Sequence, residues 1–185
     1  MLGHLLLAVL IGAWLCFETW LTTVHSRLDA NRETTTKWVM SLSFFGGALG
    51  GFAFEPARAA FMEPFGAARF VGLLIIACGF ALRVTAVRQL GDNFNVDPQV
   101  RPDQKLMRQG VYSVVRHPGY LADLLAYIGL AVVYLHPIPS LLVVVVPVTG
   151  LLYRIRIEEA MLDDAFGAAY QAYREETSAL IPWIY

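Results

Sequence analysis

Five apolar segments, separated by more polar stretches, constrain this chain more than any other feature of its sequence. They cover about residues 2–24, 38–54, 65–87, 118–135 and 140–153. The first is long enough to cross a hydrocarbon core of roughly 30 Å, whereas the fifth is short for a span and contains Pro147. Charged residues make up only 16% of the 185 residues, against about 25% in soluble domains. We therefore expect an all-α integral membrane protein with about five transmembrane helices.

The link between the fourth and fifth segments is only His-Pro-Ile-Pro, residues 136–139. Proline ends one helix and suits the start of the next, so this link predicts an antiparallel helical hairpin. Beyond it, an apolar row at helical spacing predicts a cytoplasmic amphipathic helix from Arg154 to Tyr173. The row consists of Leu162, Phe166, Ala169 and Tyr173.

Lysine and arginine are distributed unevenly around the predicted spans. With five spans, three polar regions lie on the same side of the membrane as the C-terminus. They hold three cations after the first span, five in the long loop before Pro118 and three in the tail. The other side has only Arg58 and Arg69, and Arg83 lies inside the third span. Because cytoplasmic loops carry the excess of positive charge, we expect an outside N-terminus and a cytoplasmic C-terminus, in a bacterial inner membrane.

The net charge of −1 provides no basic field for nucleic acid, and no cysteine or histidine spacing suggests a metal site. The few charges instead concentrate in two predicted cytoplasmic pieces, the loop 90–117 and the tail after Tyr153. These pieces flank the hairpin, so they meet at its base. Charges in a membrane protein are costly and tend to be functional, so we expect the chemistry there.

The helical phase of the tail predicts which of its charges face inward. Extended backwards, the apolar row reaches Glu158 and then Arg154, one turn apart, while Glu159 and Asp163 lie one residue round and nearer solvent. The alternative interpretation of Arg154 and Glu158 is an ordinary i, i+4 ion pair at the membrane interface.

The segment before the fourth span carries a second group of candidates. Pro118 suits the first turn of a helix, which leaves His117 and Tyr120 at the cytoplasmic mouth of that span. Free N–H groups there favour an anionic ligand, although His117 alone fits a helix cap equally well. Glu18 and Asp123 lie inside spans and are expected to act as supporting residues.

Taken in order, these motifs resemble the isoprenylcysteine carboxyl methyltransferase family, in its small prokaryotic, phospholipid-methyltransferase-like branch. The resemblance covers roughly residues 70 to 185, and residues 1–65 match only in being two spans. It predicts one membrane domain, 1–185, with N-terminal spans over 1–65 and a catalytic core over 66–185. The matching segments are Leu-Gly-Asp-Asn-Phe at 90–94, Lys-Leu-Met-Arg-Gln-Gly-Val-Tyr at 105–112, Arg-His-Pro-Gly-Tyr at 116–120, and Arg154, Glu158-Glu159, Phe166-Gly167, Tyr170, Tyr173 and Ile181-Pro182 in the tail.

The resemblance implies a membrane enzyme that transfers a methyl group from S-adenosyl-L-methionine to a lipophilic acceptor, either an isoprenylcysteine carboxylate or a lipid-like molecule. It implies that Glu158 binds the cofactor, and that Arg154 lies at the acceptor or the transferring methyl with Glu159 close by. The remaining cofactor contacts that it implies are Gln104, Lys105, Leu106 and Met107, mostly through their backbone, and Tyr112, His117, Pro118, Gly119 and Tyr120.

Two other classes remain as alternatives. Residues 120–125 and 181–185 also resemble the C-terminal half of membrane sterol reductases, which use NADPH, and Asp123 favours that interpretation. Arg154 with Glu158 and Glu159 fits the methyltransferase pattern better. A non-enzymatic membrane subunit with the same fold is the third possibility, since each candidate residue also has a purely structural interpretation.

Overall fold

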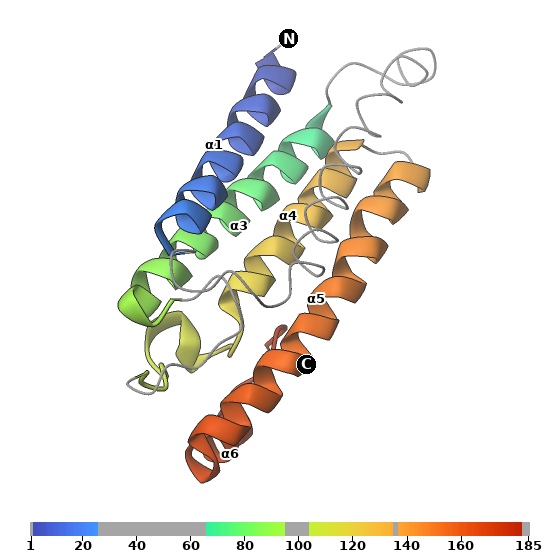
Figure 1. The fold of residues 1–185 in the computed structure, drawn as a ribbon. Helices are drawn as coiled ribbons and strands as arrows, with labels where there is room; N and C mark the ends of the chain where they lie inside the picture. The colour runs from blue at the N-terminus through green and yellow to red at the C-terminus, as the bar shows by residue number, and fades with distance from the viewer. Residues whose placement is uncertain (1, 26–65, 95–103, 135–136, 183–185) are drawn as a thin grey trace.

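The computed structural model describes residues 2–25, 66–94, 104–134 and 137–182, and these form a helical bundle (Figure 1). Helix α4 lies between α3 and α5 and packs against both. No β-strand occurs within the described residues, where the one extended pairing is an isolated bridge between Val115 and Ser178. The elements are α1 (Leu2–His25), α3 (Ala67–Leu90), the 3-10 turns η2 (Gly91–Asn93) and η3 (Gly110–Ser113), α4 (Pro118–Tyr134), α5 (Pro137–Phe166) and α6 (Ala168–Glu176).

Two stretches of the described helices are long and apolar enough to cross a membrane, Ala67–Leu90 and Ser140–Phe166. Two further apolar helices are shorter, Leu5–Leu21 and Pro118–Tyr134. The prediction of an all-helical chain with membrane-spanning segments is therefore confirmed in outline. The predicted second span, residues 38–54, lies outside the described residues, so the expected total of about five stays a prediction.

The predicted hairpin is confirmed, since α4 ends at Tyr134, α5 begins at Pro137, and the two helices pack against each other. Helix α5 is much longer than the apolar segment 140–153 that predicts it. Its 30 residues correspond to about 45 Å, because Pro147 is accommodated inside the helix and is buried there. The helix therefore runs past the start of α4, carrying its polar second half beyond the bundle (Figure 1).

Helices α3 and α4 approach closely because glycines line their contact. A Cβ atom built on Gly72 would lie 2.7 Å from the carbonyl oxygen of Gly129, and one on Gly129 would lie 2.7 Å from that of Gly72. Gly79 meets the carbonyl of Ala122 in the same way, at 2.8 Å. Small residues permit this backbone approach between membrane helices, and it fixes α4 against α3 along its length.

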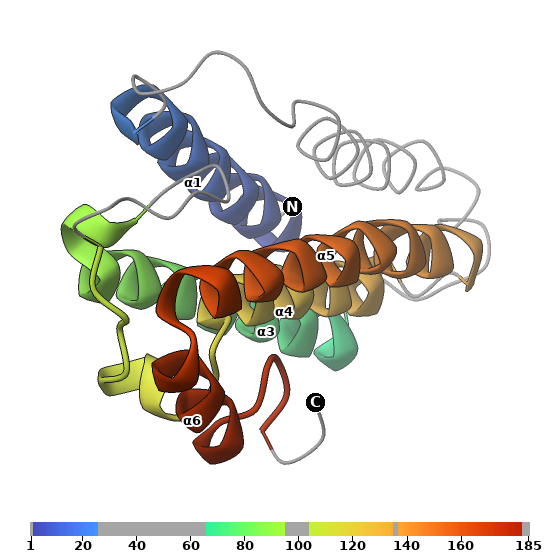
Figure 2. The same cartoon turned by 60° about the horizontal axis from the view of Figure 1, so that its bottom comes forward.

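The predicted continuous tail helix from Arg154 to Tyr173 is wrong, because the chain turns at Gly167. This glycine has φ 51°, in the left-handed region that favours glycine, and its N–H donates to the carbonyl of Asp163 at 2.8 Å. The predicted apolar row breaks there too, since Ala169 is exposed while Tyr173 is buried. The turn brings α6 back beneath the bundle, next to η3 (Figure 2).

Candidate active site at the base of the hairpin

The residues just before α4 are held in place by the chain that follows α6. The backbone N–H of Arg116 donates to the carbonyl of Ser178 at 2.9 Å, and that of His117 donates to the carbonyl of Ala179 at 3.0 Å. This pairing of two short extended segments makes the isolated bridge, and Ala179 is buried under it. The backbone of His117 is therefore fixed at the start of α4.

The side chain of His117 is 3% exposed and lies between two carboxylates of α5. Its Nδ1 is 3.7 Å from Oε2 of Glu158, and its Nε2 is 3.5 Å from Oε1 of Glu159. The imidazole also stacks on the ring of Tyr120, with centroids 5.6 Å apart. The structure thus brings together four of the predicted site residues.

Arg116 is the residue that binds this region together, which the sequence argument did not predict. Its Nε donates to Oε1 of Glu159 at 2.8 Å, and its Nη2 lies 2.7 Å from the same oxygen. Its Nη1 donates to the carbonyls of Thr177 and, at 3.3 Å, of Arg174, at the end of α6. One guanidinium therefore joins α4, α5 and α6. The signal available in the sequence was an arginine directly before a His-Pro helix start.

The prediction that Glu159 lies nearer solvent than Glu158 is wrong. The side chain of Glu159 is 16% exposed and that of Glu158 33%. The reason is that helical phase describes α5 alone, whereas the segment 114–117 and Arg116 cover the side of α5 on which Glu159 lies. Glu159 is consequently a half-buried counter-ion of Arg116, and Glu158 is the more accessible carboxylate.

The expected acceptor residue, Arg154, lies one turn before Glu158 on α5. Its guanidinium carbon is 5.8 Å from the centroid of the Tyr120 ring, a cation–π distance. Tyr120 therefore contacts both His117 and Arg154. The two predicted groups, one before α4 and one on α5, form a single cluster.

Several buried polar atoms of this cluster make no hydrogen bond to any described residue. They include Nε2 of His117 and Oε2 of Glu158, since 3.5 Å and 3.7 Å exceed ordinary hydrogen-bond distances. Oδ1 of Asp163, further along α5, also has no hydrogen-bond partner among the described residues. Leaving such an atom buried without a partner costs about 1–3 kcal/mol, so this base is suited to a polar ligand.

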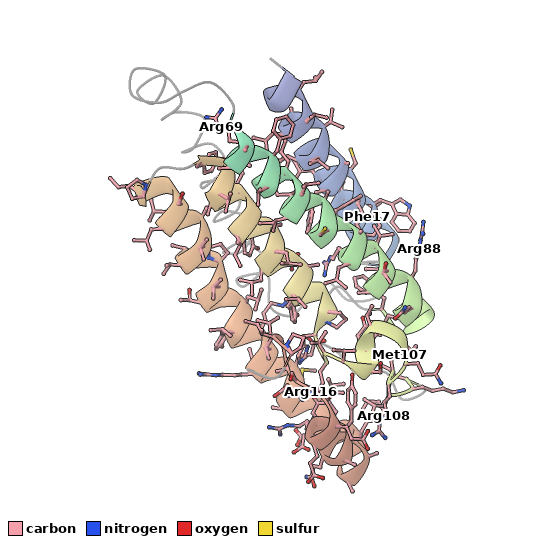
Figure 3. All side chains as sticks on the ribbon, turned by 180° about the vertical axis from the view of Figure 1, so that it is seen from behind. Phe17, Arg69, Arg88, Met107, Arg108 and Arg116 are labelled. Carbon is pink, nitrogen blue, oxygen red and sulfur yellow. The ribbon has the colours of Figure 1, made fainter. Side chains whose placement is uncertain are left out.

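The predicted loop residues Gln104, Lys105, Leu106 and Met107 lead into η3, at the same end of the bundle. The Lys105 N–H donates to Oδ1 of Asn93 at 3.3 Å, while Leu106 and Met107 are half-buried. Figure 3 shows Met107, Arg108 and Arg116 near α6, at the opposite end from Arg69. As contacts of a cofactor, these four loop residues stay predictions.

Helix α6 packs against this loop through a contact between Tyr173 and Tyr112. The Tyr173 hydroxyl donates to the Tyr112 carbonyl at 2.5 Å. Arg108 pairs with Glu176 at 2.9 Å and lies 5.3 Å from the ring centroid of Tyr173. Burial raises the pKa of Tyr173 to about 12, and burial together with the charge of Glu158 raises the pKa of Tyr112. Both phenols therefore remain neutral.

A second charged group, also unpredicted as a unit, lies inside the bundle. Arg83 of α3 binds Glu18 of α1 through two hydrogen bonds, Nε to Oε1 at 2.8 Å and Nη2 to Oε2 at 3.1 Å. The charge of Asp123 on α4 also acts on Arg83. The sequence indicated each of these residues separately, as a charge inside a span.

Known proteins match both the sequence and this fold. The family model described as phospholipid methyltransferase matches residues 67–169. Protein-S-isoprenylcysteine O-methyltransferase B of Arabidopsis thaliana is 32% identical over 115 residues, which are 61% of this chain and 58% of that protein. The protein-S-isoprenylcysteine O-methyltransferase of Tribolium castaneum is 33% identical over 116 residues, 62% of this chain and 41% of that protein. The chain thus matches about half the length of these curated relatives.

A solved structure, that of the eukaryotic intramembrane Ras methyltransferase ICMT (isoprenylcysteine carboxyl methyltransferase), superposes with a TM-score of 0.64 at 25% identity. The match covers 89% of this chain and 60% of that one. The fold is thus that of a helical intramembrane methyltransferase, and such proteins are enzymes. The chain belongs to the phospholipid methyltransferase family, and it is similar to isoprenylcysteine carboxyl methyltransferases.

Proposed function

We propose that this protein transfers a methyl group from S-adenosyl-L-methionine to a lipophilic acceptor at the cytoplasmic face of the membrane. The acceptor is an isoprenylcysteine carboxylate or a lipid-like molecule. The observation that carries the proposal is the cluster of His117, Tyr120, Arg154 and Glu158, which meets where the polar half of α5 passes the start of α4.

The buried polar atoms of this cluster fit the proposed cofactor. Among the described residues, Oε2 of Glu158 and Nε2 of His117 make no hydrogen bond. A carboxylate accepts hydrogen bonds from a ribose diol or an ammonium group, and the cofactor has both. When bound, S-adenosyl-L-methionine supplies an electrophilic methyl group on a sulfonium. The residues proposed to hold it are Glu158, His117 with Pro118 and Gly119, Tyr120, Tyr112, and the loop residues Gln104, Lys105, Leu106 and Met107.

Arg154 is the residue we propose for the acceptor. Its planar guanidinium can hold a carboxylate through two hydrogen bonds, and the ring of Tyr120 lies under it. Glu159 acts indirectly, because Arg116 neutralises it and the pair keeps His117 in position. Transfer at a carbon depends on alignment and exclusion of water, and such positioning contributes on the order of 7–11 kcal/mol.

The distribution of charge supports the proposed orientation. Arg88 lies in the last turn of α3, and Arg116 directly precedes α4. Arg108, Arg156 and Arg174 belong to the same polar end of the bundle. A cytoplasmic location of this end agrees with the positive-inside rule. A soluble cofactor then enters from the cytoplasm, and a lipid-linked acceptor enters from the bilayer.

The purified protein tests the proposal. In calorimetry we expect S-adenosylhomocysteine, the demethylated product, to bind with micromolar affinity and NADPH to bind much more weakly. Methyl-labelled cofactor, supplied with a total lipid extract and separately with prenylcysteine analogues, then identifies the acceptor from the labelled product. Binding of NADPH without binding of S-adenosylhomocysteine would contradict the proposal and favour the reductase interpretation.

A further inference from the structure

The Glu18–Arg83 pair is the charged contact between α1 and the rest of the described bundle. Arg83 uses both Nε and Nη2 to hold the Glu18 carboxylate, at 2.8 Å and 3.1 Å. Their side chains are 14% and 30% exposed. Such two-point geometry fixes the plane of the guanidinium, so Glu18 determines where the third nitrogen of Arg83 points.

That third nitrogen points to the proposed active site. A Cβ atom built on Gly119 would lie only 2.7 Å from Nη1 of Arg83. Gly119 stands between His117 and Tyr120, whose rings stack on each other. Arg83 therefore touches the start of α4 from α3, whereas Arg154 reaches Tyr120 from α5. A larger residue at 119 would displace this end of Arg83.

The same charged group interacts with a second carboxylate. The charge of Asp123 acts on both Arg83 and Arg154, as well as on Glu18. Asp123 lies one turn beyond Gly119 on α4. The contacts themselves connect α1, through Arg83, Gly119 and the adjacent Tyr120, to the arginine that we propose for the acceptor.

The pair also lies beside the apolar interior. One turn before Glu18 on α1, Trp14 lines a small cavity between α1, α3 and α4. The other lining residues are Leu10, Ile11, Ile76, Ala126 and Leu130. Glu18 and Arg83 therefore lie between this apolar space and the polar cluster.

We propose that Glu18 is a positioning residue of the active site, which acts by holding Arg83 against Gly119 and so aligns the acceptor end of the site. This role rests on the proposed methyl transfer. It assigns a function to α1, which precedes the residues 67–169 that match the family model. A purely structural ion pair, by contrast, would contribute to stability alone.

Glu18→Gln tests the role, because it keeps the shape of the side chain and removes its charge. We expect the acceptor KM to rise, and kcat/KM to fall by about tenfold or more, since small misplacements in an active site have effects of this size. The Kd of S-adenosylhomocysteine should change much less than kcat/KM, because Gly119 is the one proposed cofactor contact beside Arg83, whereas the contacts from the loop, His117 and α5 do not depend on it. Cys16→Ser, an exposed change on the same helix, is the control and should leave both constants unchanged.

The double-mutant cycle with Arg83→Gln decides whether Glu18 acts through Arg83. We expect Glu18→Gln to have no further effect on kcat/KM in the Arg83→Gln background, because the energies of two residues acting as a unit do not add. Glu18→Asp, which keeps the charge but shortens the reach, should show an intermediate loss, and it serves in place of Glu18→Gln if that variant does not fold.

Three results would overturn the inference. They are wild-type kinetics for Glu18→Gln, additive effects in the cycle, and a loss of S-adenosylhomocysteine binding that parallels the loss of activity. Failure of the wild-type protein to bind S-adenosylhomocysteine is distinguishable from all three, since it contradicts the proposed function and the inference together.

Discussion

The guanidinium of Arg116 donates to the carboxylate of Glu159 at 2.8 Å, and this pair joins the start of α4 to the polar half of α5. Because the other end of the same guanidinium binds carbonyls at the end of α6, three helices depend on one side chain. The two neighbouring glutamates of α5 therefore have different partners. Glu159 pairs with Arg116, whereas Glu158 faces His117.

Alanine variants of the two glutamates should fail in different ways. We expect Glu158→Ala to lose about tenfold or more in affinity for S-adenosylhomocysteine, since a hydrogen bond involving a charged group contributes about 1.5–3 kcal/mol. Its unfolding temperature should stay near that of wild type. Glu159→Ala should instead lower the unfolding temperature, because it leaves Arg116 buried without its counter-ion. Calorimetry and thermal unfolding in one detergent measure both effects, and equal loss of affinity with unchanged stability in both variants would contradict this division.

Arg116→Lys should destabilise the protein although it conserves the charge. A single ammonium cannot reach Glu159 and the carbonyls at the end of α6 together, whereas the guanidinium fork does. Breaking a buried pair costs up to about 3–5 kcal/mol, and we expect a substantial part of that loss in the free energy of unfolding. Arg88→Lys, at an exposed position in the last turn of α3, is the matched control. Equal stability of the two variants would show that Arg116 does not hold the base together.

Arg154→Lys should fold normally and transfer methyl groups poorly. A lysine provides a point charge in place of the planar fork that can bind a carboxylate at two points and stack on Tyr120. We expect kcat to fall by about tenfold or more, with the Kd of S-adenosylhomocysteine within about twofold of wild type. The control is Arg156→Lys, two residues further on the exposed side of α5. Wild-type turnover by Arg154→Lys on an identified acceptor would refute the assignment.

Gly72→Ala should separate α3 from α4. The added methyl would meet the Gly129 carbonyl at 2.7 Å, and overpacking of this kind costs about 1–3 kcal/mol. Gly12→Ala on α1 is the control, because nothing lies within 4 Å of its added Cβ among the described residues. Thermal unfolding compares the two, and a Gly72→Ala protein as stable as wild type would mean that the helices do not pack as closely as described.

The helices whose positions depend on the local pattern of apolar residues and prolines were predictable from the sequence. Apolar segments over 2–24, 65–87 and 118–135 anticipate α1, α3 and α4 to within a few residues, and the prolines of the link anticipate the hairpin. The turn at Gly167 was not recognised, because a glycine inside an apolar row fits an amphipathic helix until its positive φ is known. The periodicity of one helix does not indicate which other elements of the chain pack against it.

The sequence predicted that these candidate residues lie close together, but it did not predict which of them pair. His117, Tyr120, Arg154 and Glu158 do come together. The contact of Arg116 with Glu159, however, spans 43 positions of sequence and that of Arg83 with Glu18 spans 65. Such pairs depend on how whole helices pack. Periodicity alone therefore assigned Glu159 to the wrong side.

The length of α5 has a consequence for the membrane around the protein. One unbroken helix carries the apolar residues that follow Pro137 and, further along, Arg154 and Glu158. An apolar helix adjusts its depth and tilt to match the thickness of the surrounding hydrocarbon. Because α5 is one unbroken helix, any such adjustment moves Arg154 and Glu158 together along the membrane normal. The bilayer thickness thus sets the height at which these groups meet the lipid surface, so the lipid composition becomes a variable of the reaction.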